Sequence, residues 1–136
     1  MTEVMRKPPQ AIAEAVSAAM PVDPKVFREA MSRVAAAVHV ITTGGPAGRG
    51  GATMTAVTSV SDAPPTVLIC LNRSGRLATL LRANGVFSVN TLVEGDEHLA
   101  GVFAGVGGLD HEARFGVGEW TVAATGAPVQ IGRAHV

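Results

Sequence analysis

The sequence predicts a mainly β protein, an antiparallel β-barrel with helices packed around it. Several short runs rich in β-branched residues are separated by segments rich in glycine and proline, which is typical of strands joined by turns. These runs do not alternate regularly with helical patterns, as they would in a doubly wound parallel sheet. At 136 residues the chain is long enough for one core but not for two.

The composition argues against several classes of function. Hydrophobic residues make up 47% of the chain and charged residues 16%, which is typical of a globular domain. Eleven basic and eleven acidic residues cancel, so we expect no nucleic-acid partner. No apolar run approaches the roughly 20 residues of a membrane helix, so we expect no membrane association. The single cysteine, Cys70, favours a cytoplasmic setting, and the low charge favours a homodimer.

The N-terminal part of the chain predicts an arm followed by a helix. Residues 1–22 are expected to form a flexible arm, with a weak alanine-rich helix at 10–20. Asp23 is a good N-cap and Pro24 suits the first helical position. Apolar residues then follow at helical spacing, which predicts one buried face: Phe27, Ala30, Met31 and Val34.

Strand patterns dominate the chain after residue 37. We expect strands at 38–43, 52–61, 66–71 and 86–92, and a further strand that begins at Trp120. Residues 44–51 contain five glycines and are expected to form a hairpin loop between the first two strands. The strand 66–71 is apolar along its whole length, so we expect both of its faces to be covered.

Two helices are expected among these strands. Ser74 is the predicted N-cap of the first, which ends at Asn84–Gly85. The second runs from 96 to 104 and is followed by a glycine loop at 105–108. Its expected inward residues are Leu99, Val102 and Phe103.

Hydroxyl side chains line one face of the expected strand 52–61. Because side chains alternate along a strand, Thr53, Thr55 and Ser59 share that face. Hydroxyls in this arrangement can bind the polar edge of a planar cofactor such as an isoalloxazine ring. Threonines are also common on the solvent face of strands, and the pattern by itself favours that simpler interpretation.

The loop 73–76 combines a predicted helix start with two cations. Ser74 is expected to begin a helix whose first amide groups point outward, and Arg73 and Arg76 flank it. A helix N-terminus beside cations is a ready site for an anion such as phosphate. The alternative is an ordinary N-cap with solvated arginines, which the loop by itself favours.

A series of short segments carries a resemblance to a known family. The segments are 27–31, 38–43, 51–61 with Pro64–Pro65, 70–74, 84–92, 103–105, 114–115, Trp120 and 125–128. In this order and spacing they resemble the flavin reductase-like family, the reductase partners of two-component flavin monooxygenases of the 4-hydroxyphenylacetate 3-monooxygenase type. The resemblance implies an FMN-binding split β-barrel with Greek-key antiparallel topology, which forms a homodimer.

The resemblance also implies an activity. Family members are NAD(P)H-dependent flavin reductases: they bind FMN or FAD, accept hydride from NADH or NADPH at flavin N5, and supply reduced flavin to a partner flavin-dependent monooxygenase. Because the cofactors carry the reactivity, no catalytic residue is assigned. Two alternatives stay open. They are a flavin-binding electron-transfer protein of the same fold, and a non-catalytic dimeric interaction module.

Carried over by position, the resemblance implies three flavin-contacting regions. The stretch 49–56 would contact the ring, residues 70–72 would lie near the ring or ribityl chain, and the loop 73–76 would meet the phosphate. One further residue comes from a helix near the flavin. The implied set is Arg49, Gly50, Gly51, Ala52, Thr53, Thr55, Ala56, Cys70, Leu71, Asn72, Ser74, Arg76 and Phe103.

Other polar residues are not expected to form a site. The four histidines are scattered and none has a second ligand at metal-site spacing, so no metal site is expected. The segment 110–112 is polar enough for a site, but a solvated loop is the expected structure. Cys70 lies in an apolar stretch, which favours a small buried side chain over a nucleophile.

The end of the chain departs from the family pattern. We expect a flavin reductase-like domain over 23–130 that is incomplete at its C-terminus, because relatives continue with further strands after Pro128. Residues 131–136 correspond to the in-frame translation of a common sequencing adapter. We therefore expect them to be a non-native tail.

Overall fold

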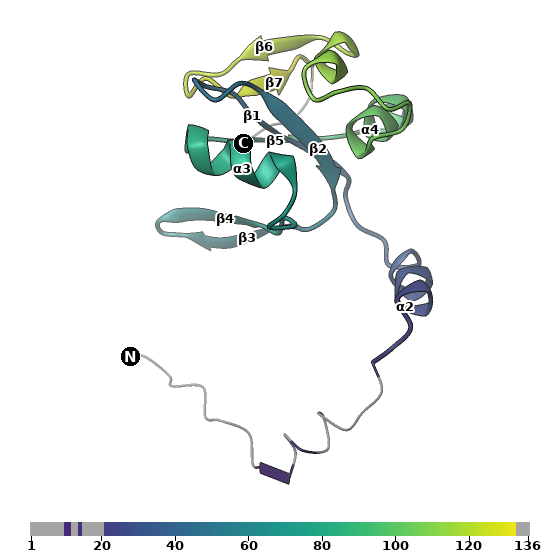
Figure 1. The fold of residues 1–136 in the computed structure, drawn as a ribbon. Coiled ribbons are helices and arrows are strands. Elements are labelled where there is room, and N and C mark those ends of the chain that lie inside the picture. The colour runs from purple at the N-terminus through teal and green to yellow at the C-terminus, as the bar shows by residue number, and fades with distance from the viewer. Residues whose placement is uncertain (1–9, 12–13, 15–20, 133–136) are drawn as a thin grey trace. The chain divides into compact units, whose positions relative to one another are not determined.

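The computed structural model describes residues 10–11, 14 and 21–132 (Figure 1). The chain divides into two compact units, residues 1–35 and 36–136. Most of the expected weak helix at 10–20, and residues 133–136 of the expected tail, lie outside the described residues. No helix in the described part has both the length and the apolar content needed to cross a membrane.

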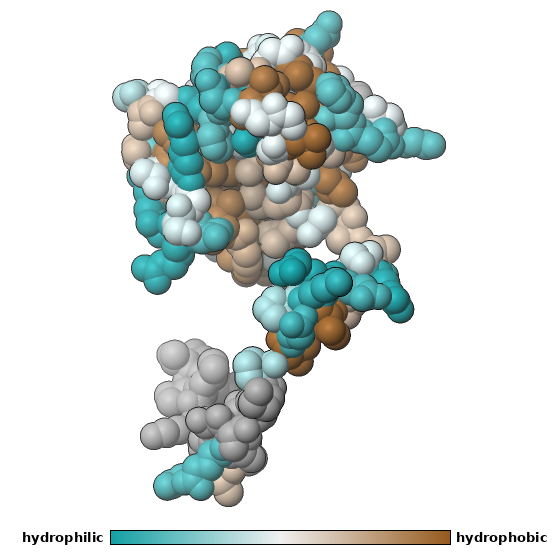
Figure 2. Space-filling model, turned by 45° about the vertical axis from the view of Figure 1, so that its right-hand side comes forward, coloured by the Kyte–Doolittle hydropathy of each residue, from teal (hydrophilic) through white to brown (hydrophobic). Residues whose placement is uncertain are grey.

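The first unit contains helix α2 (Pro24–Met31). Its start is as predicted, because the Asp23 carboxylate accepts hydrogen bonds from two amides of the first turn, at 2.8 and 3.2 Å. The expected buried face is wrong: no residue of the helix is buried, and Phe27 is 58% exposed. Figure 2 shows polar and apolar side chains on separate sides of this helix. The stripe exists, but the described part of the unit offers no second apolar surface to cover it.

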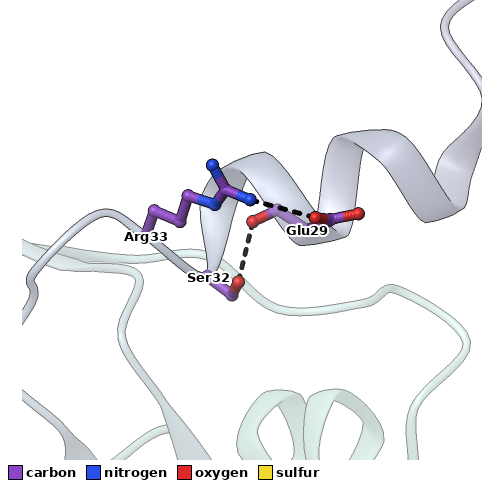
Figure 3. Close-up of polar contacts among 3 residues, drawn as sticks. All are labelled: Glu29, Ser32 and Arg33. Carbon is purple, nitrogen blue, oxygen red and sulfur yellow. Dashed lines mark hydrogen bonds and ion pairs between the residues drawn. The ribbon is translucent and has the colours of Figure 1, made fainter.

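The C-terminal end of α2 is held by contacts within the helix (Figure 3). Ser32 Oγ donates a hydrogen bond to the Glu29 carbonyl oxygen at 2.7 Å, and the Arg33 guanidinium pairs with the Glu29 carboxylate at 3.0 Å. Both charged side chains are largely exposed. An exposed pair of this kind contributes only about 0–1 kcal/mol, so it has little effect on stability.

The second unit is mainly β, as predicted. Its central sheet has three strands in the order β2–β1–β5, and all neighbours are antiparallel. Strand β1 (His39–Thr43) lies between β2 (Gly50–Met54) and β5 (Ser88–Thr91). The predicted glycine-containing hairpin between the first two strands is confirmed, with Thr43 opposite Gly50.

Two antiparallel hairpins make up the remaining described strands. They are β3 (Val57–Asp62) with β4 (Pro65–Ile69), and β6 (Trp120–Val122) with β7 (Pro128–Gln130). Figure 1 shows α3 between the central sheet and the β3–β4 hairpin. The expectation that the apolar strand 66–71 is covered on both faces is wrong, because most of β4 is exposed. In the described structure β4 pairs only with β3, so it belongs to a two-stranded ribbon and not to the interior of a larger sheet.

The expected strand 52–61 is also divided. The chain turns at Thr55 and Ala56, where the Val57 amide donates to the Thr55 carbonyl oxygen at 2.9 Å. Residues before the turn pair with β1, and residues after it pair with β4. The hydroxyls of Thr53 and Ser59 therefore belong to two separate sheets.

Helices α3 (Arg76–Asn84) and α4 (Glu97–Ala104) agree with the predicted segments. Gly85 ends α3 with a φ of 70°, a left-handed conformation that glycine adopts without a Cβ clash. The predicted inward residues of α4 are confirmed as buried: Leu99, Val102 and Phe103. A short 3-10 helix, η1 (Ala113–Gly116), follows α4.

The core lies on both faces of β1, because adjacent residues of a strand point in opposite directions. Val40 packs with α4 and η1 residues on one face, and Ile41 packs with Leu77 and Val89 on the other. The first cluster includes three aromatic rings whose centroids lie 5.2–5.3 Å apart: Phe103, Phe115 and Trp120. The two pairs that include Phe115 are edge-to-face, and contacts of this kind add to the energy of burial.

A buried polar network attaches β7 to the central sheet. Asn90 Nδ2 donates to the Val40 carbonyl oxygen at 3.0 Å, and Asn90 Oδ1 accepts from the Gln130 amide at 2.8 Å. Thr42 Oγ1 donates to the Pro128 carbonyl oxygen at 2.5 Å. Buried polar groups are stable only when paired, so this network fixes the position of the last described strand.

Candidate functional site

A pocket of about 380 Å³ lies between β2, the chain that follows β4, and the first turn of α3. Its volume is within the range of roughly 300–1,000 Å³ found for small-molecule sites. The lining combines apolar side chains with an amide, a guanidinium and an imidazole. The lining residues are Ala52, Thr53, Met54, Cys70, Leu71, Asn72, Gly75, Arg76, Leu77, Ala78 and His111.

The segment before α3 forms the polar end of this pocket. Asn72 Oδ1 accepts hydrogen bonds from the Ser74 amide at 3.1 Å and from Ser74 Oγ at 2.8 Å, which closes a tight turn. Ser74 is therefore not the N-cap that the sequence predicted. The cap is Gly75, which has no side chain to satisfy the helix amides. The hydroxyl of Ser74 is held instead by the asparagine that precedes it in the turn.

The N-terminus of α3 consequently has free donors. In the described structure the amides of Arg76 and Leu77 have no hydrogen-bond acceptor. The exposed Arg76 guanidinium stands at the same end of the helix. Unpaired amides, the positive end of the helix dipole and a cation together favour an anionic group.

Strand β2 presents its two faces to different surroundings. Ala52 faces the pocket side with the apolar residues of α3. A Cβ on Gly51 would meet the Phe103 ring at 2.7 Å, so Gly51 faces the aromatic cluster instead. Thr53 borders the pocket, but its Oγ1 donates a 2.7 Å hydrogen bond to the Ala100 carbonyl oxygen of α4. That hydroxyl is engaged within the protein.

Seven residues of the implied set lie outside the pocket lining: Arg49, Gly50, Gly51, Thr55, Ala56, Ser74 and Phe103. Thr55 and Ala56 form the exposed turn between β2 and β3. Arg49 pairs with Glu112 at 2.6 Å and lies 4.7 Å from the centre of the Phe115 ring. Phe103 is 1% exposed and is therefore a core residue behind β2.

The pocket brings together four of the five implied residues of the segment 70–76, all except Ser74. Cys70, Leu71, Asn72 and Arg76 all line it. The expectation that Cys70 is a buried side chain is wrong, because the thiol is exposed. Cys70 follows the end of β4, whose ribbon has no third described strand to cover it.

A histidine from a distant part of the chain completes the lining. His111 was expected in a solvated loop, but it borders the pocket, and its Nδ1 is buried without a hydrogen-bond partner in the described structure. The neighbouring residues hold the loop: the Asp110 carboxylate accepts from the Ala113 amide at 2.8 Å, and Glu112 pairs with Arg49. Spacing along the sequence carries no signal for this approach, because it depends on tertiary packing.

Burial and nearby charges set the ionisation of this loop. Burial is the main cause that lowers the pKa of His111, and the positive charges of Arg114 and Arg76 act in the same direction. The backbone of Gly51 and the carboxylate of Asp110 oppose that change. The hydrogen bond from the Ala113 amide is the largest cause that lowers the pKa of Asp110.

A second pocket provides a comparison. It has a volume of about 350 Å³ and lies between α4 and the end of β5. Its polar side chains are acidic, Glu94, Asp96 and Glu97, and none of the residues implied by the family resemblance lines it. Negative charge disfavours a phosphate-bearing ligand there.

Residues 31–134 match the family model described as a flavin reductase like domain. The chain is 54% identical over 115 residues to an FMN reductase (NADH), RutF 1, of Methylorubrum extorquens. That alignment covers 85% of this chain and 56% of the relative. The chain therefore spans little more than half the length of that relative.

Solved structures agree with the sequence match. The chain is 32% identical to the NADH:FAD oxidoreductase SgcE6 of Streptomyces globisporus, solved with NAD and FAD fragments, with a TM-score of 0.73. That match covers 87% of this chain and 72% of SgcE6. BorF, the flavin reductase component of a bacterial two-component tryptophan halogenase, is 30% identical with a TM-score of 0.74, over 82% and 69% of the two chains.

Proposed function

This chain belongs to the flavin reductase like domain family, and from that premise we propose that it provides the flavin site of an NADH-dependent FMN reductase. The reduced flavin would pass to a partner monooxygenase. The observation that carries the proposal is the pocket beside β2, which places a cation and unpaired helix amides at one end of an apolar cavity. FAD and NADPH are the alternative cofactor and co-substrate.

The residues of the pocket fit a flavin mononucleotide. Apolar side chains such as Met54 and Leu77 offer a surface for a planar ring, and Asn72 offers an amide beside it. The phosphate would lie at the N-terminus of α3, within reach of Arg76 and the first helix amides. Residues 49–53 would contribute mainly through backbone, because the Thr53 hydroxyl is already bound to α4.

The contribution of the protein is binding and orientation. The chemistry that a bound flavin supplies is acceptance of a hydride from the reduced nicotinamide. The chain's own residues would hold the ring in place and neutralise the phosphate charge. Orientation of this kind accounts for a large part of the rate in reactions between two bound molecules. No proton-transfer residue is assigned.

We also propose that the strands of the second unit belong to a split β-barrel with Greek-key topology, and that the protein is a homodimer. The antiparallel pairing of every described strand supports the barrel. The exposed apolar residues Val60 and Leu68 on the β3–β4 hairpin support a further surface packed there. Sedimentation equilibrium of the purified protein would test the dimer.

One experiment tests the proposed function. The purified chain is mixed with FMN and NADH, FMN binding is followed by flavin fluorescence, and turnover by loss of NADH absorbance. We expect FMN-dependent NADH oxidation. FMN binding without turnover would support a flavin-binding electron-transfer protein, and no binding would contradict the proposal.

A pair of charge reversals locates the site in the same experiment. Arg76→Glu should weaken FMN binding about 10- to 100-fold, because it replaces one charge-assisted contact of about 1.5–3 kcal/mol by repulsion. Arg82→Glu changes the same helix, but Arg82 lines a different pocket, on the side of Phe87. Arg82→Glu should leave FMN binding unchanged.

A further inference from the structure

The pocket contains a residue that the family resemblance did not include. His111 reaches it from the loop between α4 and η1, whereas the other lining residues belong to β2 and to the segment 70–78. The resemblance offers no role for it. Its position in the pocket is a property of this structure.

Gly50 locates the imidazole relative to α3. A Cβ on Gly50 would lie 3.6 Å from His111 Nδ1 and 3.8 Å from Leu77 Cδ1. The two side chains therefore approach the same point of β2. Leu80 Cδ1 of the second turn is closer still, at 2.6 Å, so the imidazole lies against the first two turns of α3. His111 and Arg76 line the same pocket.

The imidazole is held in place by the anchored residues on either side of it. Asp110 is bonded to the Ala113 amide and Glu112 is paired with Arg49, so both neighbours of His111 are anchored. His111 Nδ1 is buried without a partner in the described structure, and the ring borders the pocket. A positioned polar ring at the border of a pocket is a contact of the kind that small-molecule sites use for specificity.

Three charged side chains from the surrounding elements act on His111. Arg76 faces it from α3, Arg114 from η1, and Asp110 from its own loop. Arg49 and Glu112 neutralise each other in an ion pair, with Arg49 Nη2 2.6 Å from Glu112 Oε1. The two arginines act against a positive imidazole in the free protein, and a bound anion would reverse that balance.

We propose that His111 is a specificity-determining residue of this pocket, which binds the phosphate-bearing end of the flavin together with Arg76 and so favours FMN over riboflavin. The inference rests on the proposed function. Riboflavin is the matched ligand because it has the same ring and ribityl chain but no phosphate. His111 would contribute to the binding of the anionic end and not to the binding of the ring.

The test compares the two ligands in two variants. The full chain, His111→Gln and His98→Gln are each titrated with FMN and with riboflavin, and binding is followed by flavin fluorescence. His98→Gln is the control, since His98 is exposed on α4 and lines none of the pockets described. We expect His111→Gln to bind FMN about tenfold more weakly, as for loss of one charge-assisted hydrogen bond. Its affinity for riboflavin should change by no more than about twofold.

The pH dependence separates a charged contact from a change of shape. The FMN phosphate gains its second charge near pH 6, which strengthens binding in every variant as the pH rises. A histidine that takes up a proton when the anion binds contributes less to FMN binding as the pH rises, because fewer protons are available to charge it. The ratio of FMN affinities, full chain over His111→Gln, should therefore fall between pH 6 and pH 8. His111→Lys should keep the preference for FMN, and its ratio to His111→Gln should stay constant over that range.

The outcomes are distinct. If the unsubstituted chain binds neither ligand, the proposed function fails and this inference fails with it. If it binds FMN and His111→Gln binds both ligands with unchanged affinity, the inference alone is wrong. Equal losses for FMN and riboflavin would also overturn it, because they indicate a structural role. Urea denaturation of each variant verifies that the variants are folded.

Discussion

Replacing Gly51 by alanine should destabilise the protein, because β2 has no room for a side chain at that position. A Cβ there would lie 2.7 Å from Phe103 Cε1 and 3.2 Å from the Ile41 carbonyl oxygen. Phe103 is 1% exposed, and its ring packs against Phe115 and Trp120 with centroids 5.2 and 5.3 Å away. The ring cannot shift without disturbing both neighbours.

The magnitude follows from two opposing effects. Overpacking a tight core costs about 1–3 kcal/mol. Replacing glycine by alanine also reduces the freedom of the unfolded chain, which stabilises by about 0.4–1 kcal/mol. We therefore expect Gly51→Ala to lower the free energy of unfolding by about 1–2 kcal/mol. With a urea dependence of about 2 kcal/mol per molar, the unfolding midpoint should fall by about 0.5–1 M.

Urea denaturation followed by tryptophan fluorescence measures this effect, because the chain has one tryptophan and it lies in the affected cluster. Gly116→Ala is the matched control, since a Cβ there would meet nothing within 4 Å. The double variant Gly51→Ala with Phe103→Leu should lose about 1 kcal/mol less than the sum of the single variants, because the smaller side chain leaves room for the methyl group. A Gly51→Ala variant that unfolds at the original urea concentration, or strictly additive losses, would refute the steric argument.

Three further predictions concern hydrogen bonds. Thr53→Val should cost about 0.5–1.5 kcal/mol of stability, because it removes a hydrogen bond to α4 at nearly constant shape; an unchanged urea midpoint would contradict this. Asn90→Ala should cost about 2–4 kcal/mol in the same assay, since it leaves buried backbone groups on two strands unpaired, and a loss below about 1 kcal/mol would argue against the network. Asp110→Ala should be less stable than the unsubstituted chain at neutral pH. Because the Ala113 amide lowers the pKa of Asp110 in the folded state, that difference should disappear as the pH falls below about 4, and a constant difference would exclude it.

The start of α2 and the end of α3 were predictable from the sequence because short-range chemistry determines them. Asp23 can accept hydrogen bonds from the amides that follow it, and Gly85 can adopt a positive φ, whatever the rest of the chain does. The burial of Val102 and Phe103 followed from helical spacing. The apolar stripe of α2 shows the limit of that argument, since spacing identifies a face but not the surface that covers it.

The arrangement of the strands was harder to predict from the sequence. β-branched residues recur on both sides of the turn at Thr55, so propensity gives no sign of the break that separates β2 from β3. Cys70 is exposed, and in the described structure β4 has β3 as its one strand neighbour. Strand neighbours are set by tertiary packing, which the local sequence does not encode.

The residues of the candidate site that depend on local chemistry were predicted, and those that depend on tertiary packing were not. The segment 70–76 was identified by its local chemistry and by the family resemblance, and Cys70, Leu71, Asn72 and Arg76 do line the pocket. The N-cap was misplaced by one residue, because Ser74 bonds to Asn72 instead of to the helix. His111 was missed because its approach to Gly50 depends on how α4 and η1 pack, and no spacing rule encodes that contact.

The claim that FMN binds between β2, the segment 70–76 and the N-terminus of α3 is tested most directly by amide hydrogen exchange with and without saturating FMN. We expect slower exchange in peptides that cover 50–54, 70–78 and 109–113, and no change in the peptide that covers 92–100, which lines the acidic pocket. Protection confined to 92–100, or no protection at FMN concentrations that quench flavin fluorescence, would contradict the account.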